Sequence, residues 1–289
     1  MARRFAPNNR MIQKDARMPV LELNGVRLNV AVAGEGRPLV MLHGLGSNIH
    51  SLAGDIAHFS RTYKVIAIDS RGHGGSARPE SFTLADHVRD VLAVIDALSD
   101  APVRLIGSSG GSYIAQGVAT NRPSAICKLV LCATKAHGLI SSSVRVFGPH
   151  AQAMERMAPE ELTAFRASMV LAPDPSDAAL RELLAHDRNR LPPEEFARAA
   201  KAFEAFDFRM ALPKVAADTL VIAGHFDPLN PPDDGRECAA LIPKAVFAEM
   251  ARSGHIPRIE ERDRYLELLD WFFDREEGDM SGCPAWLDQ

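Results

Sequence analysis

Short apolar runs that alternate with segments of helical spacing constrain the fold of this chain more than any other feature. Runs such as Pro38–His43, Tyr63–Asp69 and Val103–Ile106 have the length of a buried strand. Leu84–Leu98 instead places apolar residues at the three- and four-residue intervals of an amphipathic helix. Strands that alternate with helices predict an α/β fold, a mainly parallel sheet with helices on both faces.

The rest of the chain extends the same alternation. Val20–Val32 alternates apolar with other residues around Asn24-Gly25, which predicts a β-hairpin with a two-residue turn. Further strands are expected at Cys127–Cys132, Thr219–Ala223 and Ala245–Met250, and further helices at Ser112–Ala119, Asp233–Leu241 and Arg262–Phe273.

The character of the sequence changes between residues 138 and 214. Apolar residues there follow helical spacing, and the prolines that interrupt them are Pro159, Pro173, Pro175, Pro192 and Pro193. The segment is too long for a simple connection, so we expect several short helices that form a lid. The predicted organisation is a core of residues 18–137 and 215–289, a helical lid of residues 138–214, and a flexible basic tail of residues 1–17.

Composition narrows the classes of function. The 289 residues are 46% hydrophobic and 24% charged, as in ordinary globular proteins, and the net charge of −4 does not favour a nucleic-acid partner. No apolar run approaches the ~18–20 residues that cross a bilayer, and none follows the basic N-terminus as in a signal peptide. The four cysteines form no Cys-x-x-Cys pair, which favours reduced thiols. We expect a cytoplasmic protein without a membrane partner. The sequence leaves open whether the protein forms a homodimer.

The segment Gly107-Ser108-Ser109-Gly110-Gly111 lies between an expected strand and an expected helix. A serine hydroxyl becomes an effective nucleophile when it is exposed, aimed and paired with a base, and a sharp strand-to-helix turn aims it. Such a turn needs small residues two positions before and two positions after the serine. Ser109 has glycine at both positions, whereas Ser108 and Ser112 would each place an isoleucine at one of them. Ser109 is therefore the candidate nucleophile.

Acyl transfer also needs N–H donors for the oxyanion that develops on the attacked carbonyl. The residue after the nucleophile supplies one, here Gly110, and the loop His43–Gly46 after an early strand supplies Leu45 as the second candidate. We expect the His43 imidazole to be a structural hydrogen-bonding group. A dinucleotide-binding interpretation of this loop fails because Ile49 stands where the third glycine of Gly-x-Gly-x-x-Gly belongs.

The base and the acid that orients it follow two late strands. Asp227 comes directly after Thr219–Ala223, and His255 follows Ala245–Met250, so both are expected at the carboxyl ends of strands. The order Ser109, Asp227, His255 is the one found in hydrolases whose nucleophilic serine lies on a strand-to-helix turn. His225 and Asp227 could instead form a metal pair, but no third ligand at a metal-site spacing supports it. We therefore expect neither a metal nor an organic cofactor.

Together these segments resemble the α/β-hydrolase superfamily over residues 18 to 275. The resemblance is carried by Pro38–Gly44, Asp69–Ser76, Gly107–Gly111, Asp227 and Gly254-His255. It implies an eight-stranded sheet with the second strand antiparallel, helices on both faces and an inserted lid. Within the superfamily the chain looks most like the serine-nucleophile branch of 3-oxoadipate enol-lactonases, meta-cleavage-product hydrolases, cofactor-free haloperoxidases and small carboxylesterases.

Two features depart from that pattern. Gly110 stands where related sequences often carry a larger side chain, which predicts more room or more flexibility beside the oxyanion site. The lid has neither Trp nor Tyr, and its phenylalanines are Phe147, Phe165, Phe196, Phe203, Phe206 and Phe208. Meta-cleavage hydrolases usually place an Arg and a Trp near their substrate. Arg188 or Arg190 could be that Arg, but the Trp has no match.

The resemblance and the three candidate residues imply hydrolysis of a small, mostly apolar ester or lactone through an acyl-enzyme. The nearest rival is hydrolytic C–C cleavage of the meta-cleavage type by the same residues. An aminopeptidase would need an acidic pocket, for which the lid offers Glu155, Glu182, Glu194 and Glu204. A ligand-binding receptor that keeps the hydrolase fold is the rival from another class, because one fold hosts many functions.

Overall fold

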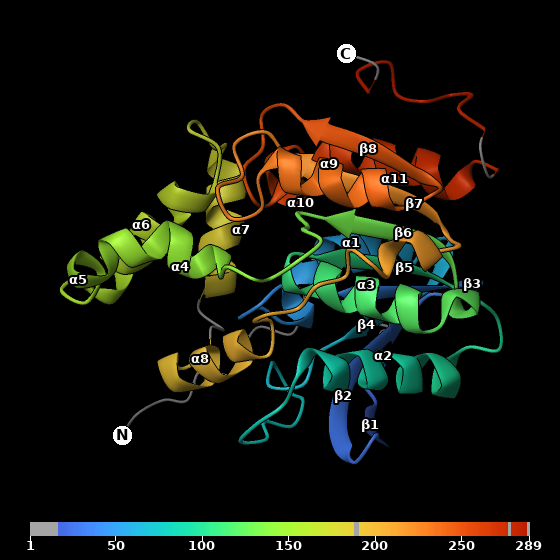
Figure 1. The fold of residues 1–289 in the computed structure, drawn as a ribbon, viewed down its shortest axis with the longest axis horizontal. Coiled ribbons are helices and arrows are strands. Elements are labelled where there is room, and N and C mark those ends of the chain that lie inside the picture. The colour runs from blue at the N-terminus through green and yellow to red at the C-terminus, as the bar shows by residue number, and fades with distance from the viewer. Residues whose placement is uncertain (1–16, 188–190, 277–278, 288–289) are drawn as a thin grey trace.

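A computed structural model describes residues 17–187, 191–276 and 279–287. Its strands are β1 (Val20–Leu23), β2 (Val26–Ala33), β3 (Arg37–Leu42), β4 (Tyr63–Ile68), β5 (Val103–Ser108), β6 (Ile126–Cys132), β7 (Asp218–Gly224) and β8 (Ala245–Met250). They form one eight-stranded sheet in the order β1-β2-β4-β3-β5-β6-β7-β8 (Figure 1). β2 is antiparallel to both of its neighbours, and the other neighbouring pairs are parallel. The predicted sheet, including its antiparallel second strand, is confirmed.

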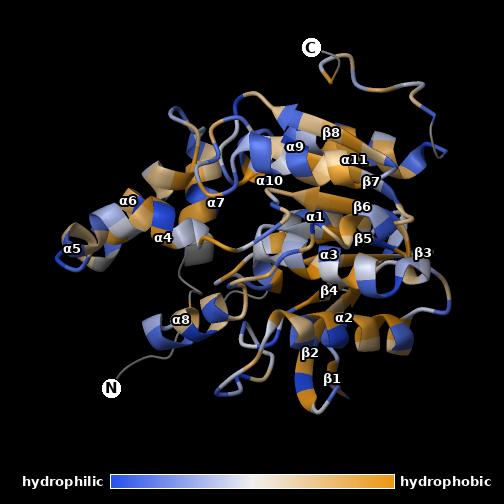
Figure 2. Cartoon of the chain, in the orientation of Figure 1, coloured by the Kyte–Doolittle hydropathy of each residue, from blue (hydrophilic) through white to orange (hydrophobic). Residues whose placement is uncertain are grey.

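Two apolar cores lie on opposite faces of the sheet because strand side chains alternate between them. Val40 and Leu42 face the core covered by α2 (Leu84–Leu98), α3 (Gly110–Asn121) and α9 (Pro232–Leu241). Leu39 and Met41 face the core covered by α1 (Ala53–Phe59) and α11 (Arg262–Asp274). Figure 2 shows that the strands are mainly hydrophobic, whereas the helices also carry hydrophilic residues. The sheet therefore forms a rigid central layer that fixes where its loops begin.

Most predicted elements lie where the sequence places them, and two helices were missed. The Asn24-Gly25 turn has positive φ at both residues, +49° and +72°, as a tight hairpin requires. α1 spans 7 residues and α10 (Pro257–Glu260) spans 4. Helices this short show too few turns of apolar repeat for periodicity to reveal them.

The residues between β6 and β7 form α4 (Ser142–Phe147), α5 (Ala151–Met154), α6 (Pro159–Val170), α7 (Asp177–Asp187) and α8 (Pro193–Lys201). We call residues 138–214 the helical insertion. Proline occupies the first position of α6 and α8, where its missing N–H costs no hydrogen bond. The insertion lies beside the carboxyl ends of the strands (Figure 1). A small apolar cluster joins it to Ile259 of α10.

Two further expectations concern the ends of the chain and the membrane. Residues 1–16 of the predicted tail lie outside the described residues, and the backbone of Arg17 pairs with that of Val32. In the part of the chain that the structure describes, no helix is long and apolar enough to span a membrane.

Candidate active site

The turn between β5 and α3 presents Ser109. Its backbone is strained, with φ +52° and ψ −121°, a conformation that costs roughly 1–3 kcal/mol in a residue with a side chain. A Cβ on Gly107 would lie 2.3 Å from the carbonyl oxygen of Gly111, and a Cβ on Gly111 would lie 2.5 Å from that of Leu42. Both positions therefore require glycine. The Ser109 N–H donates to the carbonyl of Cys132 at 2.9 Å, which ties the turn to the neighbouring strand.

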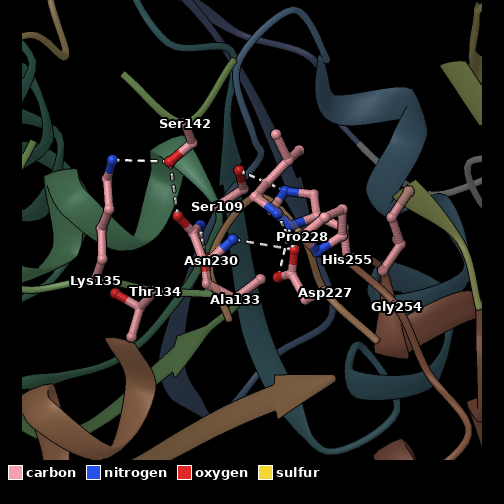
Figure 3. A network of polar contacts seen from close by, with 12 residues as sticks. Ser109, Ala133, Thr134, Lys135, Ser142, Asp227, Pro228, Asn230, Gly254 and His255 are labelled. Carbon is pink, nitrogen blue, oxygen red and sulfur yellow. Dashed lines mark hydrogen bonds and ion pairs between the residues drawn. The ribbon is translucent and has the colours of Figure 1, made fainter. Parts of the chain in front are cut away.

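Three predicted residues meet at this turn. The Nε2 atom of His255 lies 2.9 Å from Ser109 Oγ, and its Nδ1 atom lies 2.8 Å from Asp227 Oδ2 (Figure 3). Asp227 follows β7, His255 follows β8, and Ser109 follows β5, so parallel strands deliver all three to one edge. The result is one chain of hydrogen bonds from carboxylate to imidazole to hydroxyl.

The surroundings of Asp227 and His255 favour an imidazole ready to accept a proton. Asp227 is buried, and its Oδ1 atom accepts hydrogen bonds from the N–H groups of Leu229 and Asn230 at 2.8 and 3.1 Å. Burial lowers the pKa of His255, but Asp227 and, more weakly, Glu260 outweigh it and raise that pKa above its usual value. When Nδ1 donates to Asp227, the lone pair of Nε2 faces the serine hydroxyl.

The loop after β3, residues 43–46, lies against Ser109, and we call it the oxyanion loop. A Cβ on Gly44 would lie 3.3 Å from Ser109 Cβ, and a Cβ on Gly110 would lie 3.1 Å from the backbone N of Leu45. The Leu45 amide thus lies next to Gly110, which begins α3. Two amide groups beside the serine are what stabilisation of an oxyanion requires.

Two buried histidines hold this loop. The Gly46 N–H donates to His73 Nε2 at 3.1 Å, and His73 Nδ1 donates to the carbonyl of Arg71 at 3.0 Å. Burial lowers the pKa of His73 to about 3, so its ring is neutral and Nε2 can accept. His43 Nδ1 donates to the Gly44 carbonyl at 2.8 Å, in line with its predicted structural role. The sequence places His73 in the Asp69–Ser76 block but gives no signal for its role.

Glu260 is a residue that the sequence analysis missed. Its Oε2 atom accepts from the N–H groups of Gly254 and Ala172 at 2.9 and 2.7 Å, and Oε1 accepts from that of Ile256 at 2.9 Å. The carboxylate therefore accepts hydrogen bonds from the residues on both sides of His255 and links that loop to the end of α6. No sequence signal beyond an acid near a candidate histidine points to it.

Asn230 supports the acid in a similar way. Its Nδ2 atom donates to the carbonyl of Ala133 at 2.6 Å, and its Oδ1 atom accepts from Tyr113 OH at 2.9 Å and Ser142 Oγ at 3.3 Å. Lys135 Nζ donates to Ser142 Oγ at 2.8 Å (Figure 3). This network links the loop after β7, which carries Asp227, to α4, the first helix of the helical insertion.

The alternative metal pair does not form. His225 Nδ1 lies 2.6 Å from Glu249 Oε1, while Asp227 faces His255. Among the described residues, no group of three or more His, Cys, Asp or Glu side chains is arranged to hold a metal ion. Arg188 and Arg190, the arginine candidates of the C–C hydrolase interpretation, lie outside the described residues.

Comparison with known proteins agrees with the fold. The chain is 27% identical over 255 residues to 3-oxoadipate enol-lactonase 2 of Acinetobacter baylyi, covering 86% of this chain and 94% of that relative. It is 28% identical over 265 residues to a 2-hydroxymuconate semialdehyde hydrolase of a Pseudomonas species, covering 86% and 90%. The crystal structure of an enol-lactonase from Burkholderia xenovorans matches with a TM-score of 0.76 and 26% identity, covering 89% of this chain and 100% of that one. Residues 39–268 match the model of the alpha/beta hydrolase family, and the chain belongs to that family.

Proposed function

We propose that this protein is a serine hydrolase that cleaves a small, mostly apolar carboxylic ester or lactone. The observation that carries the proposal is the unbroken chain of hydrogen bonds from Asp227 through His255 to Ser109. Each residue of that chain is held by backbone contacts to neighbouring loops, so the arrangement is ready before substrate binds. Preorganisation of this kind lowers the barrier because little is left to reorganise during the reaction.

The reaction starts with attack of Ser109 Oγ on the substrate carbonyl carbon. His255 Nε2 takes the hydroxyl proton, and Asp227 stabilises the imidazolium that forms. The N–H groups of Leu45 and Gly110 hold the oxyanion. His255 then returns the proton to the leaving alkoxide, and an acyl-enzyme remains on Ser109.

Hydrolysis of the acyl-enzyme repeats these steps with water. His255 takes a proton from the water molecule as its oxygen attacks the acyl carbon, and the same two N–H groups hold the second oxyanion. The proton passes to Ser109 Oγ when the acyl–oxygen bond breaks. In a lactone the leaving oxygen stays attached to the acyl group, so the product is a single hydroxy acid or its keto form.

The helical insertion acts as a lid in this proposal. Three of its described residues contact the loops of the site. Ala172 contacts the loop that carries His255, Ser142 contacts the loop that carries Asp227, and Phe196 contacts the oxyanion loop. The phenyl rings of the insertion favour an apolar substrate. Cys132 and Cys238 are free thiols, the state that a reducing cytoplasm maintains, and this supports the cytoplasm as the place of action.

Hydrolytic C–C cleavage is the second candidate, because one relative is a 2-hydroxymuconate semialdehyde hydrolase. The same three residues would serve that reaction with a different leaving group. Esters and lactones remain the main proposal because both an enol-lactonase sequence and an enol-lactonase structure match almost the full length of the chain.

The test is turnover on three substrate classes by the unaltered enzyme and Ser109→Ala. The classes are p-nitrophenyl esters from acetate to octanoate, an enol-lactone, and a dienoate of the meta-cleavage type. We expect hydrolysis of esters or the lactone that falls by at least about 10³-fold in Ser109→Ala. Turnover of the dienoate alone would favour C–C cleavage. Binding of these compounds with no turnover of any would favour a receptor and contradict the proposal.

A further inference from the structure

A phenyl ring of the helical insertion occupies the space beside Gly110. A Cβ built on Gly110 would lie 3.4 Å from both Cε2 and Cζ of Phe203. The sequence suggested that glycine here leaves extra room or flexibility. In the structure the ring edge of Phe203 lies at van der Waals distance from this Cβ position, so a residue of the insertion takes up the expected room.

The ring of Phe203 is held on two sides by residues of the core helices. It stacks on His87 of α2 with a centroid distance of 5.3 Å and an interplanar angle of 6°. It also meets Tyr113 of α3 edge to face, at 6.0 Å and 70°. Both partners are buried, so the ring has a defined position although it belongs to the insertion.

A second ring of the insertion lies against the loop after β3. A Cβ on Gly46 would approach Phe196 Cε2 to 2.8 Å. Phe196 lies in α8 and Phe203 follows α8 closely, so one short stretch of the insertion contacts the oxyanion loop at Gly46 and the nucleophile turn at Gly110. A substrate carbonyl held by the Leu45 and Gly110 amides therefore lies close to the Phe203 ring.

We propose that Phe203 determines which acyl groups the enzyme accepts, by supplying from the insertion the apolar wall that a side chain at position 110 would otherwise supply. This inference rests on the proposed function and deepens it. The wall favours short acyl groups, because a chain extending from the bound carbonyl toward position 110 meets the ring. In an apolar pocket one methylene changes the specificity ratio by about 10- to 200-fold.

The test uses p-nitrophenyl O-ethyl alkylphosphonates with a methyl or a hexyl group on phosphorus. His255 Nε2 takes the hydroxyl proton as Ser109 Oγ bonds to phosphorus, and the bond from phosphorus to the nitrophenyl oxygen breaks. One equivalent of p-nitrophenolate is released per active site, so no turnover is needed. We expect Phe203→Ala to raise the hexyl-to-methyl ratio of labelling rate constants by at least about 10-fold. Phe203→Leu, which keeps more of the packing, shifts the ratio in the same direction by less.

Phe208→Ala is the matched control. Phe208 also follows α8, but its ring contacts the position of Gly117 in the middle of α3, 3.4 Å from a Cβ built there. The control leaves the ratio unchanged. A complementary exchange sharpens the test. Gly110→Met slows labelling by both compounds because its side chain meets the ring, and Gly110→Met with Phe203→Ala returns the preference for methyl.

An unchanged ratio in Phe203→Ala and Phe203→Leu, with labelling retained, would overturn the role of Phe203 and leave the nucleophile intact. Equal shifts in Phe208→Ala would also overturn it, since the effect would then come from loosened packing. If the folded, unaltered enzyme reacts with neither compound, the nucleophile itself is wrong, and this inference falls with it.

Discussion

The backbone N–H of His255 donates a hydrogen bond to the carbonyl oxygen of Val170 at 2.7 Å. Val170 is the last residue of α6, so the proposed base is bonded directly to the helical insertion. Glu260 strengthens the same junction through its bonds to the N–H groups of Ala172 and Gly254. The end of α6 and the His255 loop therefore form one supported unit.

Glu260→Gln tests this support. A neutral amide loses one of the accepted bonds, because its NH₂ group faces a backbone N–H, and the loss costs roughly 1–3 kcal/mol of unfolding free energy. Glu260 also contributes to the raised pKa of His255. Its removal lowers that pKa, so the acidic limb of the kcat/KM profile moves to lower pH.

The measurement is the pH dependence of kcat/KM together with thermal unfolding. Glu276→Gln, on an exposed residue after α11, is the control and should match the unaltered enzyme in both. A Glu260→Gln enzyme with an unshifted acidic limb would show that its carboxylate does not act on His255.

His73→Leu tests the support of the oxyanion loop. The variant removes the acceptor of the Gly46 N–H, so the neighbouring Leu45 amide loses its fixed position. We expect kcat to fall by about 10- to 10²-fold, less than or equal to the loss of a whole oxyanion donor, with a smaller change in KM. Steady-state kinetics on the best ester gives the answer. His50→Leu alters an exposed histidine and should leave kcat unchanged. A His73→Leu enzyme with the same kcat as the unaltered enzyme would refute the role of the His73 ring.

Buried histidines should make the protein sensitive to acid. Burial and the nearby Arg71 cation lower the pKa of His87 to about 3, whereas an unfolded histidine titrates near 6.5. Between these values the unfolded state binds more protons than the folded state. The free energy of unfolding therefore falls as the pH drops through this window, by up to about 1.4 kcal/mol per pH unit for each such group.

His87→Phe removes that titration and keeps an aromatic ring under Phe203. Within the described residues the Nε2 atom of His87 has no hydrogen-bond partner, so its loss leaves no unpaired group behind. Denaturant unfolding near pH 7 and near pH 5 should show a smaller loss of stability in His87→Phe than in the unaltered protein. His50→Phe serves as the surface control. A loss as large as that of the unaltered protein would contradict the assignment to His87.

Sequence reasoning succeeded where chemistry and backbone geometry demand particular residues. The two chain segments at this turn can approach closely only because residues 107 and 111 are glycine. This requirement distinguished Ser109 from its neighbouring serines. The apolar runs gave the strands because burial on both faces of a parallel sheet leaves little choice of residue. Asp227 and His255 were found because they follow such runs.

The supporting residues could not be found in this way. Glu260 acts through contacts with backbone amides, which any sequence provides. Phe203 was one of several phenylalanines in the predicted lid, and no pattern ranks one above another. Its role depends on a contact with Gly110 that exists only after folding.

The most direct test of the account is the site of covalent labelling by a fluorophosphonate, mapped by peptide mass spectrometry. The account predicts one adduct on Ser109 that is absent in Ser109→Ala and forms far more slowly in His255→Ala. An adduct on Ser108 or Ser112, or no adduct on the folded enzyme, would contradict it.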